Sequence, residues 1–141
     1  MDPFVRRFIR SSLAWLGVGV TLGVLMAVRP SMLAFRPAHL HANLLGFVSM
    51  MIFGVAYHVI PRFTGRPLQS PGMAALHLWL ANLGLAGMVS GFILRVYRWQ
   101  AGTAVLAAGG ILSAAGAFLF IYNLWRTLEP PRARPGALPT R

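Results

Sequence analysis

Three of the four histidines, His39, His41 and His58, lie in one stretch, RPAHLHANLLGFVSMMIFGVAYHVIPRF, which is otherwise apolar enough to form a membrane-spanning helix. Hydrocarbon contains no water to satisfy ring nitrogens, so an imidazole inside a membrane span is costly and is by default a sign of function. A neutral imidazole nitrogen is also a common ligand of transition metals. The stretch therefore predicts a functional site, which the remaining elements must position.

The spacing of the first two histidines separates their roles. His39 and His41 are two residues apart, so on a helix they point about 200° away from each other. Both are candidate cofactor-binding residues, but one interior site can use only one of them. His39 lies nearer the membrane surface, where a capping or interfacial role is expected. His41 shares one face with an apolar stripe made of Leu44, Leu45, Val48, Ile52 and Val55.

The other two histidines belong to a different depth of the membrane. His58 follows His41 by 17 residues, which is about 25 Å of helix, so one metal ion or macrocycle cannot join the two. His77 lies about one turn into the next apolar segment, at a depth similar to that of His58 if the helices are antiparallel. His58 and His77 are therefore a possible second metal site, with a hydrogen-bonded interfacial pair as the alternative.

Composition restricts the chemistry further. The chain has two acidic residues, Asp2 and Glu129, and no cysteine, which excludes thiolate sites, carboxylate-bridged metal pairs and catalytic triads. Imidazole, thioether and guanidinium groups remain, and these suit haem, with His or Met on the iron and Arg on the propionates. Met26 and Met88 are predicted at the depth of His41, although methionine is usually core packing. The candidate propionate partners are Arg36, Arg95 and Arg98, together with Arg29.

The hydropathy pattern predicts an all-α protein, a four-transmembrane-helix antiparallel bundle over residues 1–128. The sequence is 57% hydrophobic and 11% charged, with a mean hydropathy of +0.65. Its four apolar segments are each long enough to cross a bilayer. They cover about residues 11–28, 40–60, 73–94 and 102–124. The first segment is interpreted as a retained helix because its apolar run is too long for a signal peptide. Pro61 is expected to close the second.

The arginines predict an orientation. They are concentrated in the N-terminal tail, the second connection and the C-terminal tail, so both termini are expected on the cytoplasmic side of a bacterial or archaeal inner membrane. The partner of this multi-pass chain is then the lipid bilayer. Nucleic acid is not expected, because no soluble domain presents the basic charge. Residues 129–141, rich in proline and arginine, are predicted to form a disordered cytoplasmic tail.

The second segment resembles a known membrane helix. HANLL (residues 41–45) and GVAYHVIP (residues 54–61) are similar to the second helix of the catalytic subunit, subunit I, of haem-copper oxidases and nitric oxide reductases. HLWLANLGLAGM, residues 77–88, more loosely resembles the third helix. The resemblance implies that the chain corresponds to the N-terminal four-helix portion of that subunit. It further implies that His41 is an axial ligand of a low-spin haem near the outer membrane face.

The favoured hypothesis is an integral membrane protein that binds haem b through His41 and transfers electrons or binds a diatomic gas, NO or O2. The sixth iron position is then open, filled by Met26 or Met88, or filled from a second copy in a homo-oligomer. The later helices of the family supply the oxygen- or NO-reducing centre, so a complete oxidase or reductase is not expected. The alternative is a cofactor-free accessory or assembly subunit of such an enzyme. Copper handling by His39, His41 and Met32 ranks lowest.

Overall fold

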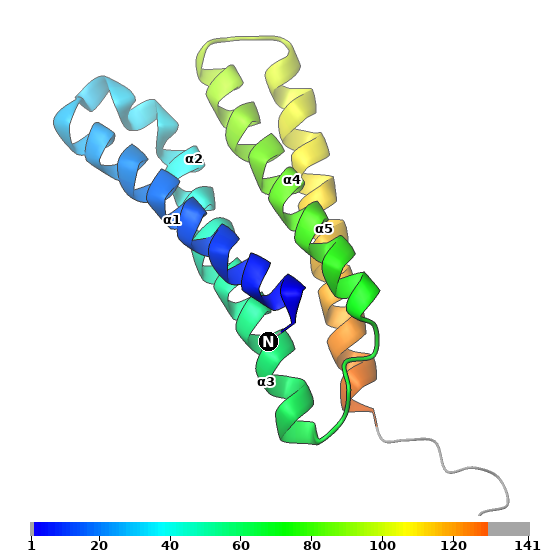
Figure 1. Ribbon diagram of the computed structural model, residues 1–141. Helices are drawn as coiled ribbons and strands as arrows, with labels where there is room; N and C mark the ends of the chain where they lie inside the picture. The colour runs from blue at the N-terminus through cyan, green and yellow to red at the C-terminus, as the bar shows by residue number, and fades with distance from the viewer. Residues whose placement is uncertain (1, 130–141) are drawn as a thin grey trace, which may run out of the picture.

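The second membrane span, Pro30–Thr64, is divided into four successive helical pieces, and the other three spans are single helices. A computed structural model describes residues 2–129 of the chain. Figure 1 shows two helical hairpins arranged up and down, one formed by the first two spans and one by the last two. No strand occurs among residues 2–129, so the predicted all-α four-helix membrane bundle is confirmed. The elements in chain order are α1 (Pro3–Val28), η1 (Pro30–Phe35), α2 (Arg36–His41), η2 (Ala42–Ser49), α3 (Met50–Thr64), α4 (Pro71–Val96) and α5 (Ala101–Leu128).

The helices extend beyond the apolar segments that predicted them. The first begins at Pro3 and not near residue 11, because Phe4, Val5 and Phe8 are buried between the arginines of its first turns. The ring centroids of Phe4 and Tyr57 lie 5.7 Å apart, which ties this amphipathic extension to α3. Hydropathy alone could not predict that the helix includes residues 3–10, because one face of this segment is basic. The predicted tail, apart from Glu129, falls outside the described residues.

Pro61 does not close the second span as predicted, because it lies inside α3, which continues to Thr64. The helix ends at Gly65, which has φ 63°. The N–H of Gly65 donates to the carbonyl of Arg62 (3.3 Å), and that of Arg66 donates to the carbonyl of Pro61 (3.0 Å). This pair of bonds is a Schellman ending, which needs a left-handed residue and so uses glycine. The glycine, and not the proline, sets the end of the helix.

Directly after His41 the second span becomes a π-helix over Ala42–Ser49. The wider i→i+5 turn is rare and frequently found at functional sites. Within it Gly46 is buried, because a Cβ there would lie 2.5 Å from Cβ of Trp15 and 2.9 Å from Cδ2 of Leu85. The buried glycine lets α1 and α4 both approach the second span at this level.

The hairpin of α4 and α5 is held by direct backbone contact. A Cβ on Gly91 would lie 2.5 Å from the backbone nitrogen of Leu106, and one on Gly109 would lie 2.5 Å from that of Met88. Such small-residue contacts allow the close packing and dispersion energy that associate helices in lipid. Gly110, the next residue, has no atom within 4 Å of its virtual Cβ and faces outward.

The connection between the two hairpins is fixed to α5. Asn123 is fully buried, and its side chain accepts from the N–H of Ser70 (2.9 Å) and donates to the carbonyl of Ser70 (2.8 Å). The hydroxyl of Thr127 accepts from the N–H of Gln69 (3.0 Å). These bonds satisfy backbone groups that would otherwise be unpaired at the membrane boundary, and they fix where α4 begins.

Gly109 and its neighbour Gly110 give a matched pair for testing this packing. Gly109→Ala should lower the free energy of unfolding by about 1–3 kcal/mol, because its methyl group overlaps the α4 backbone. Gly110→Ala should leave it unchanged or raise it by up to about 1 kcal/mol, because the residue faces open space and alanine favours the helix. Unfolding in mixed micelles monitored by circular dichroism measures both, and equal effects would contradict the assigned interface.

Candidate functional site

His39 is engaged by α1 and by its own helix. Its Nδ1 lies 2.8 Å from the carbonyl oxygen of Gly19, which can only accept, so Nδ1 is the donor. A Cβ on Gly23 would lie 3.0 Å from Cε1 of the same ring. Asn43 donates to the His39 carbonyl at 2.9 Å. The imidazole of His39 therefore joins the second span to α1, and its direction is set by two glycines of α1.

His41 points the opposite way, as its spacing from His39 predicted. Its Nδ1 donates to the carbonyl of Pro37 at 2.8 Å, which places the hydrogen on Nδ1 and leaves a lone pair on Nε2. The ring packs against Phe92 of α4, with centroids 4.8 Å apart. His41 is half-buried, in contrast to a core histidine. An imidazole held through Nδ1 in this way can offer Nε2 as a metal ligand.

The stripe of Leu44, Leu45, Val48, Ile52 and Val55 continues from His41 along the outer surface of the bundle. Its members are all exposed, from 36% at Leu45 to 58% at Leu44. The predicted apolar wall therefore exists, but it faces away from the bundle interior. A flat apolar group, lipid or another helix can cover it.

His77 lies at the centre of an aromatic cluster. It is fully buried, and its Nδ1 is 3.1 Å from the hydroxyl of Tyr57. Its ring centroid lies 4.9 Å from that of Phe8 and 4.6 Å from that of Phe53. Its Nε2 has no hydrogen-bond partner in the described part of the chain, and the ring lines a cavity of about 60 Å³ that also contacts Ser113. The cavity is far too small for a macrocycle.

Comparison with known proteins identifies the family. Residues 4–136 match the family model described as cytochrome c and quinol oxidase polypeptide I. The chain belongs to this family. The resemblance predicted from the residues after His41 is therefore confirmed at the level of the family.

Curated relatives in the family are much longer. The chain is 30% identical to the Cbb3-type cytochrome c oxidase subunit CcoN1 of Stutzerimonas stutzeri, in a match that covers 91% of this chain and 33% of that protein. It is 27% identical to cytochrome c oxidase subunit 1 of Rhodobacter capsulatus, which covers 90% of this chain and 29% of that one. The chain thus spans about a third of the length of the curated relatives it matches.

His58 and His77 are neighbours in depth but do not share a hydrogen bond. Nη1 of Arg62 donates to Nδ1 of His58 at 2.9 Å, on the exposed side of α3. His77 bonds instead to Tyr57, the residue before His58, on the buried side. Residues 2–129 contain no group of three or more histidines or acids that could hold a metal ion. The structure therefore does not bring the predicted second pair together.

Most of the other predicted residues of this subunit I homologue lie near one end of the bundle. Arg36, at the start of α2, and Arg95 and Arg98, near the end of α4, are exposed. The α1–η1 and α4–α5 connections next to them both lie at the upper end of Figure 1. Met26 is half-buried near the end of α1. The sulfur of Met88 instead accepts from the hydroxyl of Ser113 on α5 at 3.7 Å. The arginines and Met26 thus share the end that carries His41, whereas Met88 is engaged across the second hairpin.

Sequence reasoning missed Tyr57, which within residues 2–129 is the hydrogen-bond partner of His77. Tyr57→Phe should lower the free energy of unfolding by about 1–3 kcal/mol, because it leaves Nδ1 of a buried imidazole unpaired. Tyr122→Phe is the control, since Tyr122 is 53% exposed and should change it by less than about 0.5 kcal/mol. Chemical unfolding in detergent compares the two, and an equal response would show that the Tyr57–His77 bond contributes nothing.

Proposed function

We propose that this chain binds a haem through Nε2 of His41 and serves in electron transfer or in binding of a diatomic gas, NO or O2, in a respiratory membrane complex. One observation carries the proposal: the Nδ1–H of His41 is anchored on Pro37, so the other ring nitrogen presents its lone pair outward. Membership of the subunit I family supports it, because relatives in that family are named as cytochrome c oxidase subunits.

The surroundings of His41 fit such a group. One face of a porphyrin can pack on the exposed apolar stripe defined above, and Phe92 of α4 packs against the imidazole. Arg36, Arg95 and Arg98 lie at the same end of the bundle, where they can pair with propionates. Bound haem supplies one-electron chemistry, and haem b is the proposed type. The chain's own part is to orient one nitrogen, exclude water and balance charge.

The sixth iron position divides the proposal into three forms. Met26 is available at the correct end, whereas the sulfur of Met88 already accepts from Ser113. In the other two forms the position is open, or it is filled by a second copy of the chain. The exposed stripe next to His41 favours a partner chain, because an apolar helix face beside a ligand is the natural place to contribute one. The proposed orientation keeps both termini cytoplasmic.

A cofactor-free accessory or assembly subunit remains the second candidate. The same stripe supports it, since a row of exposed leucine, valine and isoleucine on a membrane helix can pack against a helix of a larger oxidase. In that case His41 would stabilise the start of the second span through its bond to Pro37 and its contact with Phe92.

The visible spectrum of the purified protein tests these two functions. The haem proposal expects a reduced-minus-oxidised haem band in the wild type, lost in His41→Ala because the iron ligand is removed. His39→Gln is the matched control, since its amide can still donate to Gly19, and the band should persist. A purified protein that stays colourless even after haem supplementation would contradict haem binding and favour the cofactor-free accessory function. Loss of the band in His39→Gln but not in His41→Ala would overturn the ligand assignment.

A further inference from the structure

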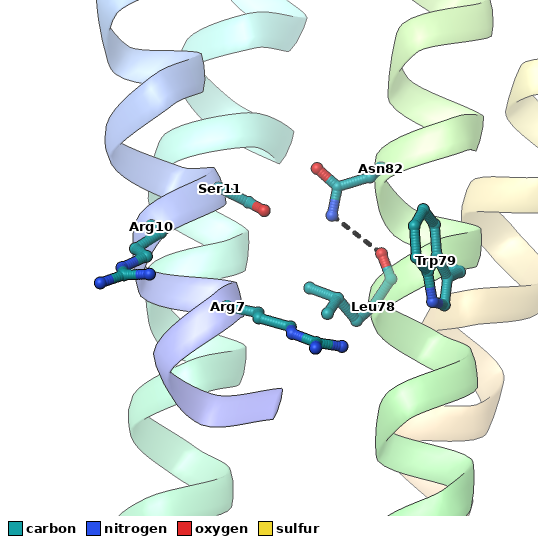
Figure 2. A pocket seen from close by; sticks show the side chains of 6 residues that line it. All are labelled: Arg7, Arg10, Ser11, Leu78, Trp79 and Asn82. Atoms are coloured by element: carbon teal, nitrogen blue, oxygen red, sulfur yellow. Dashed lines mark hydrogen bonds between the residues drawn. The ribbon is translucent and has the colours of Figure 1, made fainter. Parts of the chain in front are cut away.

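A groove of about 560 Å³ lies between α1 and α4, away from His41 and the apolar stripe. Figure 2 shows it from close by, with α1 on one side and α4 on the other. Its volume is in the range of small-molecule sites, which are about 300–1,000 Å³. Its lining combines cationic, polar and aromatic groups: Arg7, Arg10, Ser11, Leu78, Trp79 and Asn82.

The positive charge of the groove has no acidic counterpart within residues 2–129. Arg7 and Arg10 are exposed, and the ion pair within residues 2–129 is that of Arg126 with Glu129. The chain's other acid, Asp2, forms no ion pair in that part of the chain. The two exposed guanidinium groups can therefore pair with an anion from outside the described part of the protein.

The two arginines differ in their direction. In Figure 2 the guanidinium of Arg7 reaches across toward Leu78 of α4, whereas that of Arg10 points away from α4. The hydroxyl of Ser11 is directed into the groove from the α1 side. Arg7 is therefore placed to hold an anion between the two helices, with Arg10 as a flanking charge.

The depth of the groove matches the boundary between headgroups and hydrocarbon. α1 has 26 residues, about 39 Å of helix, which exceeds the hydrocarbon thickness of about 30 Å. Arg7 and Arg10 fall in its first turns, about 6 and 10 Å from Pro3. Trp79 of α4, 60% exposed, is the kind of side chain that marks the interface.

At the inner end of the groove, the polar side chain of Asn82 is bonded to other protein groups. Asn82 accepts from Nε1 of Trp15 at 3.2 Å and donates to the carbonyl of Leu78 at 2.8 Å, so its amide is already engaged. Beyond Arg7 and Ser11, the wall is formed by the apolar surfaces of Leu78 and Trp79. A ligand that suits this surface is anionic at one end and apolar at the other.

We propose that the groove is a binding site for an acidic glycerophospholipid. Its phosphate is held by Arg7, with Arg10 flanking and the hydroxyl of Ser11 as a donor, and an acyl chain lies along Leu78 and Trp79. Basic pockets between transmembrane helices are known to bind lipid headgroups through this chemistry. The site is independent of haem binding, and it joins the two hairpins where α1 and α4 face each other.

Native mass spectrometry of the full chain in detergent, titrated with phosphatidylglycerol or phosphatidylcholine, tests the proposal. The wild type should prefer phosphatidylglycerol, and Arg7→Gln should weaken its binding about fivefold, the value of one arginine near a lipid surface. Arg6→Gln is the matched control, because Arg6 is adjacent on α1 but does not line the groove. It should change the affinity less than about twofold, and Arg10→Gln should fall between the two.

Two further measurements separate a lipid site from general charge attraction. Ser11→Phe should reduce the binding of both lipids with every arginine retained, because the side chain fills the groove. Millimolar inorganic phosphate should not displace bound phosphatidylglycerol. Displacement by phosphate would mean an anion site without a lipid requirement, and equal losses in Arg6→Gln and Arg7→Gln would mean diffuse attraction. Either result, or no preference for the acidic lipid, would overturn the proposal.

Discussion

A polar atom inside the hydrocarbon must find its partner within the protein, and this constraint arranges the polar residues of the bundle. His39 bonds to the carbonyl of Gly19, and Trp15 bonds to Asn82, so each pair crosses between two helices. Both bonds require closely packed helices. At Gly19 the absence of a side chain leaves room for Asn43, so the second span can pack closely against α1. The polar atoms therefore specify which helix faces which, a task that apolar contacts in lipid perform weakly.

The imidazoles of His77 and His41 differ in how far they are enclosed by the bundle. Nε2 of His77 is unpaired but enclosed beside a cavity of about 60 Å³, so no large group reaches it. Nε2 of His41 is free on a half-buried ring whose other nitrogen is fixed by Pro37. The His77 cluster packs α1, α3 and α4 together, whereas the half-buried ring of His41 is oriented by its bond to Pro37 and its contact with Phe92.

Much of this arrangement could be predicted from local pattern. The four spans followed from hydropathy, and the opposite directions of His39 and His41 followed from the helical period, because both depend on neighbouring residues. The prediction that Pro61 closes the second span was wrong, since the left-handed conformation of Gly65 decides where α3 ends. The bond between Tyr57 and His77 was beyond sequence reasoning. It depends on how two helices are rotated about their axes, and no spacing within either helix contains that information.

The π-helical turns between His41 and Met50 explain how one span serves two environments. A regular helix would keep the face of His41 aligned with the residues that follow, whereas a wider turn rotates them. Gly46 thus enters the contact with Trp15 and Leu85, while Leu44 and Val48 remain outside. The stripe therefore lies on the outer surface of a segment whose opposite face is tightly packed against Trp15 and Leu85. The imidazole of His41, just before these turns, packs instead against Phe92 of α4, so one span contacts both a neighbouring helix and its surroundings.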